Sequence, residues 1–488
     1  MKSKSKYRIA LFHFHGHINN RDILSSNYFD VGYSTLACIE LARAFIKENS
    51  SVEIYTRYYS SGEYNIQEEA LNDCNAKIIK IKCGQDDKIL SSNEILKHIP
   101  ELTRKVSDYM AFKKNKTDVV ICFGAAAGLC ASILKKKIKI PFIYIPETLS
   151  YNLISDLKIN SKNCEAVIKR AGLHLMHSAE TTSFLCCDAV AVPNALKTES
   201  ILKSALYREI QGKIHNINKI NYGVNADNYK FEKYQQNSKN ENGKLELINL
   251  IESRIAQDRI NLPFLITDIS LKINDNAFNL IKIYNSSKEL QKSANLMIIG
   301  KIDNKRLISN LKKNNLEGKL CVLKYSNYYT ELPQIFGYCS EKKSIFVNFN
   351  GSENNLLVLS NLMTAMSAGL AVITAKNDEI SEFLDSNRYG LMFVNLKQAL
   401  KNILYLISKE GLFDIYREKA VKRISANYVW SVISRKFLRL IESIEKKGCC
   451  CVQNINIPNY FVKQSKQEDD QTIKSNFKNI LVNNNFKF

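Results

Sequence analysis

The sequence predicts an α/β protein built from two doubly wound, Rossmann-like domains. Its 488 residues are enough for two or three domains of ordinary size. Short apolar runs alternate with longer segments of helical periodicity, which is typical of βαβ units and a parallel sheet. The alternation occurs twice, before and after a polar segment rich in Asn, Lys and Gln. This repetition predicts two domains rather than one.

Seven candidate strands precede the polar segment. The clearest helix among them is Ser34 to Lys47, where apolar residues recur at helical spacing, and further helices fit between the other strands. Parallel strands joined in this way form one sheet with helices on both faces. The strands are expected at Arg8 to Phe14, Val52 to Thr56, Lys77 to Ile81, Asp118 to Phe123, Phe142 to Ile145, Ala189 to Val192 and Ile214 to Ile220.

The polar segment, residues 226–244, is expected to be a linker between a first domain (1–225) and a second domain (245–425). The rest of the chain (426–488) is expected to be a helix followed by a polar tail from Gly448 to Phe488. The strands of the second domain are expected at Leu245 to Glu252, Asn295 to Gly300, Leu320 to Leu323, Ser344 to Asn348 and Ala371 to Thr374, and the closing helices at Gln398 to Ser408, Leu412 to Asn427 and Trp430 to Lys446.

Composition narrows the function classes. The net charge of +21 would suit nucleic acid or phosphorylated ligands, but the lysines are spread along the chain and no nucleic-acid motif accompanies them, so we expect no nucleic-acid partner. No stretch approaches the ~18 apolar residues of a membrane helix, and we find no secretory signal. The 13 cysteines lack metal-type spacing and are expected to be free thiols in a cytoplasmic protein.

A series of short motifs runs through the chain from its first strand to its tail. Their shared order resembles that of the bacterial type of sucrose-phosphate synthase, a retaining glycosyltransferase of the two-Rossmann-domain (GT-B) class, family 4. The motifs are His15-Gly16, Asp30-Val-Gly32, Glu40-Leu-Ala-Arg-Ala, Cys83-Gly-Gln-Asp-Asp87-Lys88, His98-Ile-Pro100-Glu101, Tyr222-Gly223-Val-Asn225, Ser253-Arg254, Ala365-Met-Ser-Ala-Gly369-Leu, Arg388-Tyr-Gly390, Asn427-Tyr-Val-Trp430 and Asn456-Ile-Pro458-Asn-Tyr-Phe461.

The resemblance implies two domains that face a cleft, with the last helix and tail packing back on the first domain. It implies transfer of a hexosyl group from UDP- or ADP-glucose to fructose 6-phosphate, with the acceptor on the first domain and the nucleotide sugar on the second. No metal or other cofactor is expected. A leaving diphosphate carries concentrated negative charge, so such a site needs fixed cations or backbone amides at a helix N-terminus.

On the donor side, the resemblance places Arg254 at the end of the first strand of the second domain, where a guanidinium grips phosphate oxygens. Its usual partner lysine corresponds to Arg259 or, after an insertion, to Lys272, which we favour slightly. Glu353 matches the carboxylate beside the transferred sugar. The second carboxylate of that motif, which contacts the ribose, is replaced by Thr364.

The glycine-rich turn that approaches the diphosphate also differs. The family has Gly-Gly-Gln there, whereas this chain has Gly32, Tyr33 and Ser34. A tyrosine adds a side chain where the family has none, and its β-carbon disfavours the positive φ open to glycine. We therefore expect an obstructed approach of the backbone to the ligand.

On the acceptor side, Lys88 matches the lysine that holds the acceptor phosphate. The His-Arg-Arg run that supplies the other phosphate ligands becomes His174, Leu175 and Met176, so two charge-assisted hydrogen bonds of about 1.5–3 kcal/mol each are lost. Glu147 stands where the family has a histidine facing the donor sugar, and an ionised carboxylate near a diphosphate would be repelled. Fructose 6-phosphate is therefore a doubtful acceptor.

Two functions remain open: an active glycosyltransferase with altered donor and acceptor, or a non-catalytic relative that acts as a binding or regulatory partner. We expect His13, His15 and His17 to be structural or sugar-contacting rather than a metal cluster, because no Cys or Asp lies near them in the sequence. Lipid attachment at Cys449 to Cys451, giving weak membrane association, is the alternative to a flexible tail with free thiols.

Overall fold

The computed structural model divides the chain into two compact units. Among the described residues, the first unit holds the chain up to Asn221 and again from Ile433 onward, and the second unit holds Tyr222–Val432. Within this described part, no helix combines the length and the apolar character needed to cross a membrane. The described residues are 6–15, 18, 33–58, 65–71, 74–84, 90, 92–113, 116–156, 172–214, 216–226, 241–269, 274–300, 316–324, 331–351, 356–450, 452–463 and 467–483.

The first unit is built on an eight-stranded sheet of order β3-β4-β2-β1-β5-β6-β7-β8. The seven candidate strands are confirmed and pair in parallel, whereas β3 is an antiparallel edge strand that the sequence did not predict. The order reverses between β1 and β5, so their carboxyl ends form a switch point where α/β proteins bind ligands. The strands are β1 (Arg8–Phe12), β2 (Ser51–Tyr58), β3 (Ile66–Ala70), β4 (Lys77–Lys82), β5 (Val119–Phe123), β6 (Phe142–Ile145), β7 (Ala189–Val192) and β8 (Ile217–Lys219).

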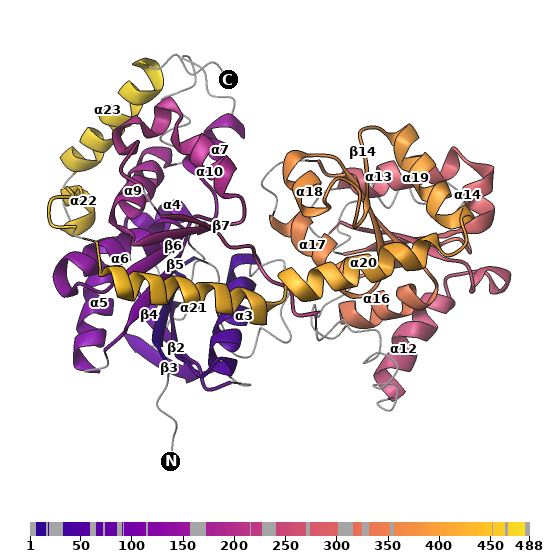
Figure 1. Cartoon of the computed structure of the whole chain (residues 1–488), viewed down its shortest axis with the longest axis horizontal. Helices are drawn as coiled ribbons and strands as arrows, with labels where there is room; N and C mark the ends of the chain where they lie inside the picture. The colour runs from indigo at the N-terminus through magenta and orange to yellow at the C-terminus, as the bar shows by residue number, and fades with distance from the viewer. Residues whose placement is uncertain are drawn as a thin grey trace. The chain divides into compact units, whose positions relative to one another are not determined.

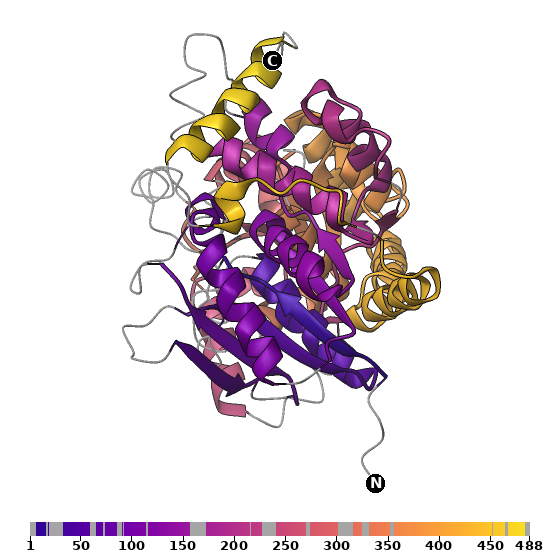
Figure 2. The ribbon, with the colours of Figure 1, turned by 90° about the vertical axis from the view of Figure 1, so that its left-hand side faces the viewer.

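Helices cover both faces of this sheet. Figure 1 shows α5, α6 and α9 on one face and α3 on the other, and Figure 2 looks at the unit from the side of the first three. The helices α6 and α9 approach closely because Gly128 has no β-carbon, which would collide with the side chain of Ser183. The helices are α3 (Tyr33–Lys47), α4 (Ser92–Leu96), α5 (Ile99–Phe112), α6 (Gly124–Ile138), α7 (Ser150–Asp156), α9 (Leu173–Cys186), α10 (Ala195–Leu202) and η1 (Ala205–Ile210).

The second unit contains a parallel six-stranded sheet of order β11-β10-β9-β12-β13-β14. Its switch point lies between β9 and β12. The helices α13, α14 and α19 pack on one face, and α16, α17 and α20 on the other. The elements are α12 (Glu241–Glu252), η4 (Gln257–Arg259), β9 (Phe264–Asp268), α13 (Asn274–Asn285), α14 (Lys288–Ser293), β10 (Asn295–Ile299), β11 (Leu320–Leu323), α16 (Glu331–Glu341), β12 (Ile345–Asn348), α17 (Leu356–Ser367), β13 (Ala371–Ala375), α18 (Asp378–Phe383), β14 (Leu391–Phe393), α19 (Leu396–Ser408) and α20 (Leu412–Asn427).

The strand expected at Leu245 to Glu252 is wrong, because these residues belong to the helix α12. Leu247, Ile248 and Ile251 have helical spacing, and a short apolar run does not by itself distinguish a strand from a helix. The sheet begins instead at β9, whose five residues are all buried. This error also removes Arg254 from the strand end that its predicted role requires.

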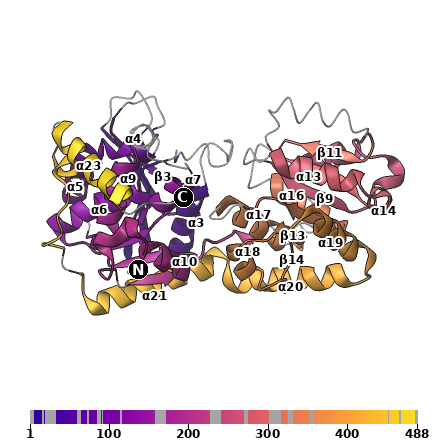
Figure 3. The same cartoon turned by 90° about the horizontal axis from the view of Figure 1, so that it is seen from above.

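The chain returns to the first unit within α21 (Trp430–Lys447), as the resemblance implies. The tail beyond it contains two helices, α22 (Asn459–Val462) and α23 (Gln467–Asn483), so it is not merely a polar extension. Phe461 and Phe477 are buried in the core of the first unit, and α23 contacts α9. Figure 3 shows α23 on the same side of this unit as α5, α6 and α9.

Lys135 fastens the beginning of the tail to the first unit. Its ammonium is buried, pairs with Asp188 at 2.6 Å and lies 2.9 Å from the Sγ of Cys450. The backbone N–H of Cys450 donates to the other carboxylate oxygen of Asp188. Cys449 is exposed and Cys451 lies outside the described residues, so lipid attachment at this run stays a prediction.

Candidate functional site

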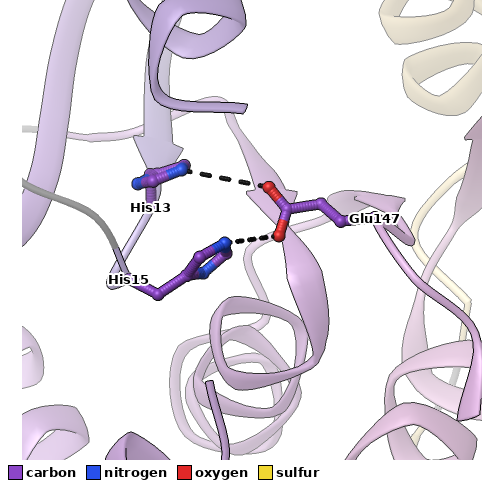
Figure 4. Close-up of side chains that lie close together, drawn as sticks. All are labelled: His13, His15 and Glu147. Carbon is purple, nitrogen blue, oxygen red and sulfur yellow. Dashed lines mark ion pairs between the residues drawn. The ribbon is translucent and has the colours of Figure 1, made fainter. Parts of the chain in front are cut away.

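Three polar side chains meet at the carboxyl edge of the first sheet. His13 and His15 follow β1, and Glu147 follows β6. His15 Nε2 donates to Glu147 Oε2 at 2.6 Å, and His13 Nε2 lies 3.9 Å from Glu147 Oε1. Figure 4 shows both imidazoles directing a ring nitrogen at the one carboxylate. We call these three residues the His-His-Glu cluster.

The elements around the cluster hold it in place. The two imidazole rings stack with centroids 4.7 Å apart, and Ser34 in the first turn of α3 lies 3.1 Å from His13 Nε2 through its hydroxyl. Gly124, which follows β5, has a φ of +78°. A β-carbon there would lie 2.7 Å from Glu147 Oε2 and 3.2 Å from His15 Cε1, so only glycine leaves room for the pair.

Burial and charge give the members of the cluster different protonation states. Burial, together with the charge of His15, lowers the pKa of His13 to about 3, so His13 is neutral. Burial alone would lower the pKa of His15, but the charge and hydrogen bond of Glu147 outweigh it and raise that pKa. Burial alone would raise the pKa of Glu147, but His15 and then His13 outweigh it and lower that pKa.

This pairing corrects the expectation that Glu147 brings an unpaired negative charge to the site. A carboxylate that is bonded to a protonated imidazole has no net charge as a pair, so its repulsion of a phosphate is much smaller. The cluster offers a carboxylate oxygen and a neutral imidazole, which can bind hydroxyl groups or a metal ion. Its position beside the switch point makes it the candidate site of the first unit.

The structure separates the other acceptor residues from the cluster. His174 lies in α9, and its Nε2 pairs with Asp470 of the tail helix α23 at 2.8 Å. Leu175 and Met176, which the resemblance aligns with two arginines, are buried in the apolar core. Ser34 lies at the cluster. The structure describes the backbone of Tyr33 but not its side chain, and Lys88 and Gly32 lie outside the described residues.

The two candidate donor arginines contact different strands of the second sheet. Arg254 is exposed after α12, and its guanidinium donates to the main-chain oxygen of Val322 in the edge strand β11. Arg259 is buried and donates to the side chains of Asn295 and Tyr284. Because Asn295 begins β10, Arg259 lies at the amino end of that strand, which contradicts its predicted phosphate contact.

Thr364 is buried in α17, and its predicted place at the ribose stays a prediction. Lys272 and Glu353 lie outside the described residues, so their predicted roles stay predictions. Both flank the switch point in sequence, since Lys272 follows β9 and Glu353 follows β12.

Sequence reasoning missed a group of amides at this switch point. Asn276 of α13 donates to the backbone oxygen of Asp268 and to the side chain of Asn348, both at 3.3 Å. Asn361 of α17 donates to the Asp268 carboxylate at 3.3 Å. Asp268 and Asn348 end the strands β9 and β12, so a correct placement of β9 would have identified them. We call these four residues the amide cluster.

The comparisons with known proteins agree with this fold. No protein-family model matches the chain. The chain is 23% identical over 473 residues to a probable sucrose-phosphate synthase of Thermosipho melanesiensis, covering 94% of this chain and 99% of that one.

Two solved structures are similar over nearly the whole chain. A sucrose-phosphate synthase from Thermosynechococcus elongatus superimposes with a TM-score of 0.65 at 14% identity, covering 91% of this chain and all of the other. The Anabaena protein HepE, solved in complex with UDP-glucose, has a TM-score of 0.55 at 12% identity, covering 90% of this chain and all of the other.

The resemblance noted in the sequence is therefore confirmed. The chain is similar to sucrose-phosphate synthases over almost its whole length, and its two units have the GT-B fold of the solved structures that it resembles.

Proposed function

We propose that this protein transfers a hexosyl group, with retention, from a nucleotide sugar such as UDP-glucose to a sugar acceptor. The similarity to sucrose-phosphate synthases along almost the whole chain carries the proposal. The complex of HepE with UDP-glucose, a structure of similar fold, supports a nucleotide sugar as the donor. The two polar clusters support it further, because each lies at the switch point of one sheet.

In this proposal the amide cluster marks the donor side. Asp268 and Asn348 stand at the strand ends that border the switch point, where side-chain amides and carboxylates suit the hydroxyls of a ribose or a sugar. Neither Asp268 nor Asn348 supplies the positive charge that a leaving diphosphate needs. We therefore assign that role to Lys272 and place the carboxylate of Glu353 beside the transferred sugar.

The acceptor side is the His-His-Glu cluster in the first unit. Its carboxylate and neutral imidazole can accept hydrogen bonds from sugar hydroxyls. The residues that replace the family's two phosphate-binding arginines, Leu175 and Met176, belong to the core and offer no charge. We therefore favour an unphosphorylated sugar over fructose 6-phosphate as the acceptor.

A second candidate function is that of a catalytically inactive relative in the cytoplasm, which binds a nucleotide sugar or a protein partner without turnover. The observation that favours it is the position of Arg259, which is buried at the amino end of β10 and donates to Asn295 and Tyr284. A site that lacks this guanidinium would stabilise the departing diphosphate less.

Product analysis separates the two functions. The full chain is incubated with UDP-, ADP- or GDP-glucose and with free or phosphorylated hexoses, while binding of each nucleotide sugar is measured by thermal shift. A disaccharide product supports the transferase. Stabilisation without product supports the inactive relative. The absence of both product and stabilisation at millimolar concentrations contradicts the transferase and an inactive relative that binds a nucleotide sugar, which leaves only the binding of a protein partner.

A further inference from the structure

The His-His-Glu cluster has a property that does not depend on the proposed function. One ligand atom from each of His13, His15 and Glu147 lies within 4.8 Å of the others. We propose that these three residues form a binding site for a divalent transition-metal ion such as zinc. The sequence-based expectation of no metal did not consider Glu147, because that residue is more than one hundred positions away from the histidines.

The chemistry of the donor atoms points to this class of metal. Two imidazole nitrogens and one carboxylate oxygen form a ligand set that zinc uses in open sites, where a water or a substrate takes the remaining position. Imidazole also suits copper, iron and nickel, whereas magnesium and calcium prefer oxygen ligands. We therefore expect Zn²⁺ to bind and Mg²⁺ not to bind.

The three ligand atoms lie within 4.8 Å of one another, so no two of them need to approach by more than about 1.5 Å to reach the spacing of a tetrahedral zinc site. Two ligand atoms that each lie about 2 Å from one zinc ion in a tetrahedral arrangement are roughly 3.3 Å apart. His13 Nε2 and Glu147 Oε1 are 3.9 Å apart, already close to that separation. His15 Nε2 and Glu147 Oε2 are 2.6 Å apart, so their hydrogen bond must open by less than about 1 Å when an ion replaces the shared proton.

Two further observations separate this cluster from an ordinary surface pair. Glu147 Oε1 is a buried atom without a hydrogen-bond partner among the described residues, and a buried acceptor of this kind is costly unless something binds it. Gly124 at positive φ leaves free the space that a β-carbon would fill beside Glu147. The side chains of His15 and Glu147 are 20% and 13% exposed, so an ion can reach them.

Isothermal titration calorimetry of the full chain, stripped with a chelator and titrated with ZnCl₂ or MgCl₂, tests the proposal. We expect one zinc per chain at the cluster and no binding of magnesium. His15→Ala and Glu147→Gln should each weaken the zinc affinity at least tenfold. Replacing a residue that only hydrogen-bonds to a metal ligand already weakens affinity by about tenfold or more, so the loss of a ligand should be no smaller. His98→Ala removes a histidine outside the cluster and should leave the affinity unchanged.

The cysteines are the competing ligands, and Co²⁺ distinguishes them. Cobalt held by nitrogen and oxygen shows visible d–d absorption, whereas thiolate ligands add an intense charge-transfer band. We expect the first spectrum alone, with its d–d bands lost in His15→Ala and kept in a Cys449→Ala, Cys450→Ala double variant.

Several results would overturn the proposal. They are no heat with zinc at micromolar protein, zinc affinity that is equal in the parent and in His15→Ala, or a thiolate band in the cobalt spectrum that disappears when Cys449 and Cys450 are replaced. Because each is a binding measurement, none of them bears on whether the chain transfers a sugar.

Discussion

Gly124 is the residue on which the geometry of the His-His-Glu cluster depends most directly, and Gly124→Ala is the sharpest test of that geometry. The added β-carbon would lie 2.7 Å from Glu147 Oε2, the oxygen that accepts from His15. The carboxylate is the end of a flexible side chain, so we expect it to move away rather than to distort the sheet. The variant should therefore fold with the His15–Glu147 pair broken.

The expected loss has two parts. A non-glycine residue at a φ of +78° costs roughly 1–2 kcal/mol. The broken charge-assisted hydrogen bond adds about 1.5–3 kcal/mol. Gly124→Ala should therefore lower the free energy of unfolding of the first unit by about 2.5–5 kcal/mol.

Gly212→Ala is a matched control. Gly212 lies in the same unit and has a φ of +72°, but a β-carbon there would meet nothing within 4 Å. This variant should show only the backbone cost of roughly 1–2 kcal/mol. Urea denaturation followed by hydrogen exchange in β5 and β6 measures both variants. Equal losses in the two variants, or a pKa of His15 unchanged by Gly124→Ala in an NMR titration, would refute the reasoning.

Three further variants test individual contacts. Lys135→Met leaves the Asp188 carboxylate buried without its cation, so it should cost about 3 kcal/mol in urea denaturation and speed hydrogen exchange at Cys450, and a loss below about 1 kcal/mol would contradict the buried pair. Burial raises the pKa of Glu180 to about 7, so the folded chain holds a proton that the unfolded chain has already lost, and stability should fall as the pH rises from about 4.5 to about 7. Glu180→Gln should abolish that part of the pH dependence, and an identical pH profile in the two proteins would contradict it. Arg259→Met should lower the free energy of unfolding of the second unit by about 2–4 kcal/mol in urea denaturation, because the guanidinium makes buried hydrogen bonds within the fold. The affinity for UDP-glucose in calorimetry should not change. A large loss of affinity in a folded variant would instead mean that Arg259 contacts the donor.

Periodicity was enough to predict the parallel strands of the first sheet, because most of them are largely buried and are separated by helices. It failed at α12, where Leu247, Ile248 and Ile251 form an apolar run in a helix. The first strand of the second unit was placed there and not at the later run Phe264–Asp268, which forms β9. The strand β3 carries two glutamates and has no fully buried residue, so it gave no apolar signal.

The candidate site was only partly predictable for a different reason. The motifs identified His15, Ser34 and Glu147 one at a time, but the pairing of His15 with Glu147 depends on which strands are neighbours in the sheet. The charge of Glu147 was misjudged for the same reason, because the sequence does not show that its carboxylate pairs with His15. On the donor side, one misplaced strand put Arg254 at a strand end, although it follows the helix α12, and put Arg259 beside the phosphate, although it contacts the first residue of β10.

Hydrogen exchange of the full chain with and without UDP-glucose tests the central claim most directly, because it shows whether a nucleotide sugar binds and at which edge. We expect added protection in the second unit at the carboxyl ends of β9 and β12, around Asp268 and Asn348. The absence of protection at saturating UDP-glucose, or protection confined to the opposite edge around Arg259 and Asn295, would contradict the account.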